Sequence, residues 1–380
     1  IMNLLEPSLE FARKDVADVF AYAKKNGFEG SRLESWDFSY WSEKYQQAEY
    51  SLSAEELKPY FQLESCIDAV FGLATRLYGI SFTELDNVPV YHEDVKVYEV
   101  KDADGSHLAL FYADFFPRES KGGGAWMTSF REQSFTKDGK VEKRPHVSIV
   151  CNFTKPTETE PSLLTFYEVT TFLHEFGHAL HSLFADVKYR GLSGVEGDFV
   201  ELPSQIMENW AFATPMLKQY AVHYRKSDVM PDDMIQKIQQ SAKFNEGFNT
   251  TELVAAALSD LDIHSLQSAE KIDVAEFERE ALVEKRGLIP QIEPRYHYTY
   301  FSHIFDGGYS AGYYFYIWAE VLDKDAYQAF VESGDIFDKA SCSFLYILRL
   351  LFLFFFFLLF AFFSFFFCFV FLYFTLFCIF

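Results

Sequence analysis

His174-Glu175-Phe176-Gly177-His178 is the segment of this chain that gives the clearest indication of its fold. In an α-helix, residues four apart lie on the same face about 6 Å apart along the axis, so His174 and His178 can both offer an imidazole nitrogen to one metal ion. Glu175 lies one position further round the helix, where a carboxylate can act as general base toward a water molecule. The motif therefore predicts two zinc ligands and a base within about one helical turn.

The residues around this motif have the periodicity of a buried helical face. Apolar side chains recur at i, i+3 and i+4, and no proline interrupts the segment between Ser162 and Phe184. Pro161 suits the first turn of such a helix. The competing interpretation is a chance pair of buried histidines, which needs no further ligand.

A catalytic zinc ion normally has a third protein ligand, and the sequence offers a candidate downstream. Glu201 is followed by Pro203, which suits the first turn of a second helix running through residues 208–210. Such a helix would direct Glu201 at the metal from its start. Glu208 lies seven residues further on, hence on the same face, and can orient a histidine ligand through a carboxylate hydrogen bond.

These residues, together with a second block at 301–318, resemble the thimet oligopeptidase family of zinc peptidases. The second block contains Phe-Ser-His-Ile-Phe at 301–305, Gly-Gly-Tyr at 307–309 and Gly-Tyr-Tyr at 312–314. The resemblance runs from about residue 5 to about residue 340. It implies a mainly α fold with a small β-sheet, in which a zincin-like catalytic lobe borders a deep substrate channel. Segments 88–92, 110–116, 121–126 and 294–303 resemble the bacterial peptidyl-dipeptidase branch more than the oligopeptidase A branch.

The resemblance also implies catalytic roles for His303, Tyr309 and Tyr316, which would stabilise the oxyanion and hold the substrate. A tyrosine hydroxyl suits this role because it is a neutral donor at neutral pH. Without the resemblance, aromatic residues at this near-helical spacing would be assigned to core packing. We therefore expect Tyr309 and Tyr316 at the site, and Tyr313 and Tyr314 in the packing.

A glycine run at 122–124 lies among three predicted strands at 95–100, 108–112 and 146–151. The edge of a small sheet can pair with an extended peptide, and Gly123 and Gly124 would allow the substrate backbone to approach closely. A structural hairpin without contact to substrate is the alternative.

Hydrophobic periodicity and the positions of glycine and proline residues divide the chain into four parts. We expect a helical part, a strand-rich insert near the active site, a helical zinc-binding region and an apolar tail, at residues 1–85, 86–158, 159–342 and 343–380. The chain does not begin with methionine, and the resemblance implies a further amino-terminal lobe, so we expect a fragment of a longer protein.

The tail is dominated by phenylalanine, and no charged residue follows Arg349. Its length exceeds the roughly 20 residues that cross a bilayer. However, no basic cluster flanks it, and the family pattern stops near Ser343. We interpret it as the product of a shifted reading frame or an erroneous translation, with a genuine membrane anchor as the alternative.

Composition limits the partners and the compartment. With 33 basic and 55 acidic residues the formal net charge is −22, which disfavours binding to nucleic acid or to an anionic membrane. The five cysteines are widely spaced and odd in number, which argues against a disulfide scaffold and favours a reducing compartment. No basic region followed by an apolar run opens the chain, so no secretion signal is visible. We expect a cytoplasmic monomer.

The sequence thus predicts a metallopeptidase with one Zn²⁺ per chain that hydrolyses short peptides. Release of carboxyl-terminal dipeptides is the favoured reaction, and internal cleavage is the second possibility. A different class of function is the alternative: a non-catalytic, membrane-anchored binding protein that retains the peptidase shape.

Overall fold

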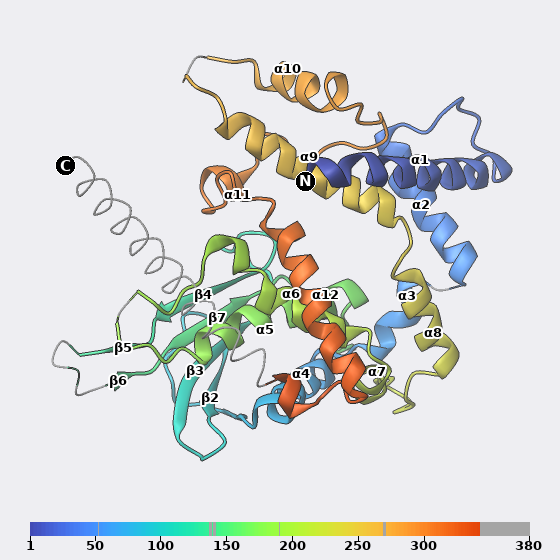
Figure 1. Cartoon of the computed structure of the whole chain (residues 1–380). Helices are drawn as coiled ribbons and strands as arrows, with labels where there is room; N and C mark the ends of the chain where they lie inside the picture. The colour runs from blue at the N-terminus through green and yellow to red at the C-terminus, as the bar shows by residue number, and fades with distance from the viewer. Residues whose placement is uncertain (52, 137–138, 140–141, 190, 269–270, 343–380) are drawn as a thin grey trace, which may run out of the picture.

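The structure is a computed structural model that describes residues 1–342, except 52, 137–138, 140–141, 190 and 269–270. The described elements form two lobes (Figure 1). The upper lobe in this view is helical, and the lower lobe combines a sheet with helices.

The upper lobe is built on two long helices that pack side by side, α1 and α9 (Figure 1). Leu5 and Leu9 of the first are buried against Val254 and Leu258 of the second. The helices of this lobe are α1 (Met2–Lys25), α2 (Ser35–Tyr50), α9 (Glu246–His264), α10 (Val274–Arg279) with a π-helical turn at Glu280–Glu284, and α11 (Ser302–Phe305).

The lower lobe contains a five-stranded sheet in the order β1-β2-β3-β7-β4, in which β3 and β7 are parallel and the other neighbours are antiparallel. The strand β4 is therefore an edge strand. The sheet strands are β1 (Ser81–Glu84), β2 (Lys96–Lys101), β3 (His107–Asp114), β4 (Trp126–Arg131) and β7 (His146–Val150), beside a separate pair of β5 (Ser134–Phe135) and β6 (Glu142–Lys143).

The helices of the lower lobe cover this sheet and extend beyond it (Figure 1). They are α3 (Ala54–Leu57), a 3₁₀ turn at Lys58–Tyr60, α4 (Leu63–Tyr78), α5 (Phe166–Leu183), a 3₁₀ turn at Gly197–Phe199, α6 (Leu202–Ala211), α7 (Thr214–Tyr220), α8 (Asp232–Ser241) and α12 (Phe315–Ser333).

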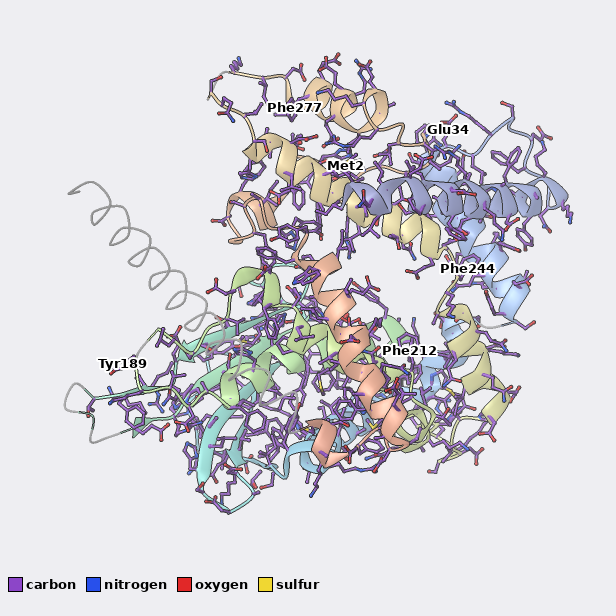
Figure 2. All side chains as sticks on the ribbon, viewed as in Figure 1. Met2, Glu34, Tyr189, Phe212, Phe244 and Phe277 are labelled. Atoms are coloured by element: carbon purple, nitrogen blue, oxygen red, sulfur yellow. The ribbon has the colours of Figure 1, made fainter. Side chains whose placement is uncertain are left out.

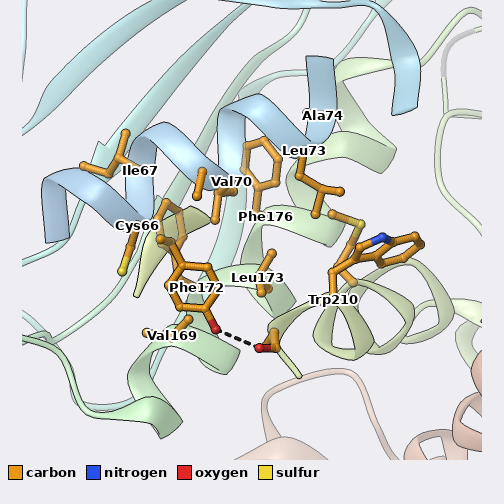
Figure 3. Packing of buried hydrophobic residues seen from close by; sticks show 14 of the residues in the cluster. Cys66, Ile67, Val70, Leu73, Ala74, Val169, Phe172, Leu173, Phe176 and Trp210 are labelled. Carbon is orange, nitrogen blue, oxygen red and sulfur yellow. Dashed lines mark hydrogen bonds between the residues drawn. The ribbon is translucent and has the colours of Figure 1, made fainter. Parts of the chain in front are cut away.

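The core of the lower lobe forms where α4 and α5 pack together (Figure 3). Phe172 and Phe176 of α5 are fully buried, and Val70 and Leu73 of α4 lie in the same cluster. Burying each such side chain stabilises the fold by about 1.5–3 kcal/mol. The apolar face of the motif helix is thereby fixed against the core, and His174 and His178 instead contact Glu201, next to α6.

The mainly α architecture with a small sheet is confirmed. One helix start was predicted wrongly: α5 begins at Phe166, after Pro161, and Thr165 is its N-cap. The Thr165 side chain accepts from the Glu168 N–H, and the Glu168 carboxylate accepts from the Thr165 N–H at 2.7 Å. This reciprocal capping box sets the start of the helix.

Within the described residues, no helix is long and apolar enough to cross a membrane. The phenylalanine-rich tail at 343–380, for which a translation artefact and a membrane anchor were weighed, lies outside those residues.

Candidate active site

Three side chains converge, two from α5 and one from the residue that directly precedes α6. The rings of His174 and His178 on α5 have their centroids 5.0 Å apart. The Nε2 atoms lie 3.3 Å (His174) and 3.2 Å (His178) from Oε2 of Glu201. The three potential ligand atoms lie within 4.8 Å of one another, and two imidazoles with one carboxylate form a donor set that suits Zn²⁺. The residues predicted as zinc ligands are therefore brought together.

The close approach of α5 and α6 depends on Gly177. A Cβ atom at this position would lie only 2.1 Å from the carbonyl oxygen of Pro203, in the first turn of α6. Glu201 directly precedes that helix, as predicted, and Ser204 donates its hydroxyl to Glu201 Oε2 at 2.8 Å. Glycine inside the motif thus lets the third ligand reach the two histidines.

Glu208 orients one of the histidines. Its Oε1 lies 2.6 Å from His174 Nδ1, which leaves Nε2 directed at the site. Burial by itself would lower the pKa of His174, but Glu201 and Glu208 outweigh it and raise the pKa well above its usual value. Burial would likewise raise the pKa of Glu201, but the two histidines lower it strongly. The cluster therefore carries carboxylate charge that a divalent cation would balance.

Glu175 lies beside this cluster on α5 and is only 6% exposed. Burial is the main cause that raises the pKa of its carboxyl group above the usual value. A carboxylate with a raised pKa accepts a proton more readily at neutral pH, which suits the general base predicted from the motif.

The tyrosine-rich block reaches the same cluster from the opposite side. Tyr309 donates its hydroxyl to Glu201 Oε1 at 2.5 Å, and the Tyr316 ring stacks on the Tyr309 ring at 5.6 Å between centroids. Burial, followed by the charge of Glu201, raises the pKa of both hydroxyls, so both remain neutral donors. The His303 ring lies 6.2 Å from that of Tyr309, and burial lowers its pKa. Tyr313 is 2% exposed and packed, as expected.

The glycine run stands at the start of β4, where its backbone is held by a side chain. The Asn152 amide donates to the carbonyl oxygens of Gly122 at 2.9 Å and Gly124 at 2.8 Å. Neither Gly123 nor Gly124 has a heavy atom within 4 Å of its Cβ position, so the space beside the loop is open. The geometry leaves room for a peptide at the edge of β4.

Sequence reasoning missed the buried ion cluster behind this loop. Asp114, at the end of β3, accepts from both terminal nitrogens of Arg118 and from Lys121 Nζ, at 2.8 to 3.0 Å. Lys121 directly precedes the glycines, so the cluster fixes where the loop begins. A carboxylate that ends an otherwise apolar strand is the pattern that could have revealed it.

The structure contains two cavities near the helices that carry the metal cluster, one within the lower lobe and one between the lobes. One, of about 420 Å³, lies between residues 127–129 of β4 and the later half of α5, where His178 and Ser182 line it. The other, of about 960 Å³, has Phe11 of α1 on one side and Phe212, after α6, on the other. Figure 2 shows Met2 of α1 and Phe212 in the two different lobes.

Comparison with known proteins agrees with this geometry. The sequence model of the family described as Peptidase family M3 matches residues 1–345. The chain belongs to peptidase family M3. It is 45% identical over 311 residues to dipeptidyl carboxypeptidase of Salmonella typhimurium, covering 81% of this chain and 45% of that protein. It is 43% identical over 344 residues to the Escherichia coli enzyme of the same name, covering 88% of this chain and 50% of that protein.

This M3 chain is also 36% identical over 339 residues to oligopeptidase A of Escherichia coli, covering 87% of this chain and 49% of that protein. It spans about half the length of the relatives it matches. The match to the M3 family covers every residue of the cluster described above, and the predicted family membership is confirmed.

Proposed function

We propose that this chain carries the catalytic region of a zinc-dependent metallopeptidase that hydrolyses short peptides. The supporting observation is the convergence of His174, His178 and Glu201 within 4.8 Å, with the buried Glu175 beside them. Zinc, when bound there, would polarise the peptide carbonyl group and acidify a water molecule.

Residues of the chain itself carry out the proton transfer and stabilise the developing negative charge. Glu175 accepts the proton of the attacking water and passes it to the leaving amine. Tyr309 and Tyr316 are neutral donors that face the site and are suited to stabilise the negative oxygen that develops on the carbonyl group. His303 stays neutral, because burial and the charge of Arg295 lower its pKa, and serves as a further donor.

The substrate is proposed to lie along the outer edge of β4. An extended peptide can add to an edge strand through main-chain hydrogen bonds, and the open space at Gly123 and Gly124 admits its backbone. Residues 127–129 of β4 line one cavity with the later half of α5, and the glycine run precedes this strand. A peptide that pairs antiparallel to β4 would direct its carboxyl end toward the glycine run.

Release of carboxyl-terminal dipeptides is the favoured reaction within this proposal. The relatives named dipeptidyl carboxypeptidase are more similar to the chain than the relative named oligopeptidase A. In the part of the chain that the structure describes, no hydrogen bond or ion pair holds the guanidinium of Arg295. Tyr313, Tyr296, the Glu252 carboxylate and Tyr167, at the start of α5, act electrostatically on this group and raise its pKa against the effect of burial. A peptide carboxylate is a ligand that such a group would bind.

Zinc analysis combined with hydrolysis of a short free-acid peptide tests the proposal. Glu175→Gln should keep the metal and lose at least about a hundredfold in turnover, the usual scale of a general base. Glu55→Gln, at an exposed position remote from the site, is the matched control and should behave as wild type. Retained metal with near-normal turnover in Glu175→Gln would refute the role of Glu175.

The same assay separates the peptidase from the non-catalytic binding protein. A protein that binds the metal but cleaves no peptide at any chain length would favour the binding protein. Product masses from a free-acid peptide and its carboxyl-amidated copy separate dipeptide release from internal cleavage, since only internal cleavage tolerates the amide equally well.

A further inference from the structure

The segment that carries Tyr309 is held by a residue of the other lobe. Asp260 lies on α9, in the upper lobe, and is fully buried. Its Oδ1 accepts the N–H of Ala311 at 2.9 Å, and its Oδ2 accepts the N–H of Tyr313 at 2.8 Å. Both carboxylate oxygens thus bind the backbone of one short segment, residues 306–314, and Oδ1 also lies 2.8 Å from Nδ1 of His264 on the same helix.

This segment needs an external anchor because its own backbone is strained. Ala311 has φ +54°, a left-handed conformation that is unfavourable for a residue with a side chain because Cβ then lies too close to the following carbonyl oxygen. Such a conformation persists only where the surroundings fix it. The Asp260 carboxylate bonds to Ala311 itself, so the anchor acts on the strained residue.

Hydrogen bonds connect the anchored segment directly to the metal site. Its N–H at Tyr309 donates to the carbonyl oxygen of His303 at 2.9 Å, and its N–H at Gly312 donates to that of Tyr309 at 2.8 Å. The Tyr309 hydroxyl then reaches Glu201. A buried carboxylate therefore lies at one end of a short chain of contacts, and the metal cluster lies at the other.

The segment also joins the two lobes. It runs from α11, beside α9, to α12, which packs on α6 in the lower lobe (Figure 1). At the α12 end, Gln205 of α6 donates its amide to the carbonyl oxygen of Tyr316 at 3.1 Å. The position of Tyr309 thus depends on contacts with both lobes.

We propose that Asp260 is a positioning residue that holds segment 306–314, and through it the Tyr309 hydroxyl, over the metal site. Its kinetic consequence rests on the proposed peptidase function. Asp260 touches neither the metal ligands nor the substrate edge, so its removal should change turnover while leaving metal binding intact.

Asp260→Asn is the test variant, because asparagine keeps the size but can accept only one of the two N–H groups. Hydrogen exchange at the Ala311 and Tyr313 amides should become at least about tenfold faster. Turnover should fall about 10- to 100-fold, the effect of a misplacement of about 1 Å, with KM within about threefold. Zinc content should stay at the wild-type level.

Asp262→Asn is the matched control on the same helix, since the Asp262 carboxylate pairs instead with Arg286 at 2.9 Å. It should leave exchange at 311 and 313 and turnover unchanged. Ala311→Gly supplies the rescue, because glycine adopts positive φ without strain. In the Asp260→Asn background it should restore roughly five- to tenfold of the lost turnover.

Faster amide exchange with unchanged turnover would overturn the inference, and so would equal losses in Asp262→Asn or the absence of rescue by Ala311→Gly. A wild-type protein that cleaves no peptide would refute the proposed function instead. In that case hydrogen exchange at the Ala311 and Tyr313 amides still tests whether Asp260 holds the segment. Unchanged exchange in Asp260→Asn would refute that role.

Discussion

Replacing Gly177 by alanine tests whether the close packing of α5 on α6 builds the metal site. The new Cβ would lie 2.1 Å from the Pro203 carbonyl oxygen and 2.7 Å from Ser204 Cα. Non-bonded carbon and oxygen atoms normally stay about 3.3 Å apart or more, so α6 must move by roughly 1 Å. Overpacking of this kind costs about 1–3 kcal/mol of unfolding free energy. Helix propensity alone predicts the opposite sign, since alanine in a helix is favoured over glycine by about 1 kcal/mol.

The same movement should weaken metal binding, because Glu201 directly precedes α6. Zinc ligand distances tolerate only about 0.2 Å. Zinc content and thermal unfolding of Gly177→Ala measure both effects. Gly194→Ala is the matched control, since no heavy atom lies within 4 Å of its Cβ position and its φ is not positive. A Gly177→Ala protein that is as stable as wild type and retains its full zinc content would show that the packing argument is wrong.

Three further predictions follow from the site. Tyr309→Phe should retain zinc but lose about a hundredfold or more in turnover, the usual effect of deleting an oxyanion donor; unchanged turnover would exclude that role. Arg295→Met should raise the KM for a free-acid peptide about tenfold or more and leave the KM for the carboxyl-amidated peptide unchanged. An equal rise in KM for the two peptides would exclude carboxylate binding by Arg295. Burial by itself would raise the pKa of Asp114, but hydrogen bonds led by those of Arg118 and Lys121 outweigh it and lower the pKa. The ionised Asp114 carboxylate therefore stabilises the fold above about pH 4, and this stabilisation is lost as the pH falls through its folded-state pKa. The loss of unfolding free energy in Asp114→Asn, relative to wild type, should shrink on acidification. A loss that stays constant from pH 7 to pH 3 would contradict this.

Local sequence rules were sufficient for the elements that carry the ligands. The four-residue spacing of His174 and His178 placed both on one helix face, and Pro203 marked the helix that Glu201 precedes. The strand predicted at 108–112 forms as β3, although it extends to Asp114. These features depend on periodicity and capping, which neighbouring residues determine.

Contacts between distant segments were out of reach of those rules. That Gly177 must be glycine depends on the position of Pro203, which is set by how two helices pack. The bonds from Ala311 and Tyr313 to Asp260 join segments about fifty residues apart in sequence, and no local pattern specifies that pairing. The α5 helix begins after Thr165 and not at Pro161, because the capping box at Thr165 outweighs the preference of proline for a first helical turn.

Anomalous diffraction at the zinc absorption edge, on crystals of the purified protein, tests the central claim most directly. The proposed function predicts one peak per chain, about 2.0–2.2 Å from Nε2 of His174, Nε2 of His178 and a carboxylate oxygen of Glu201. A peak bound by other residues, or no peak in a preparation that still hydrolyses peptides, would contradict it.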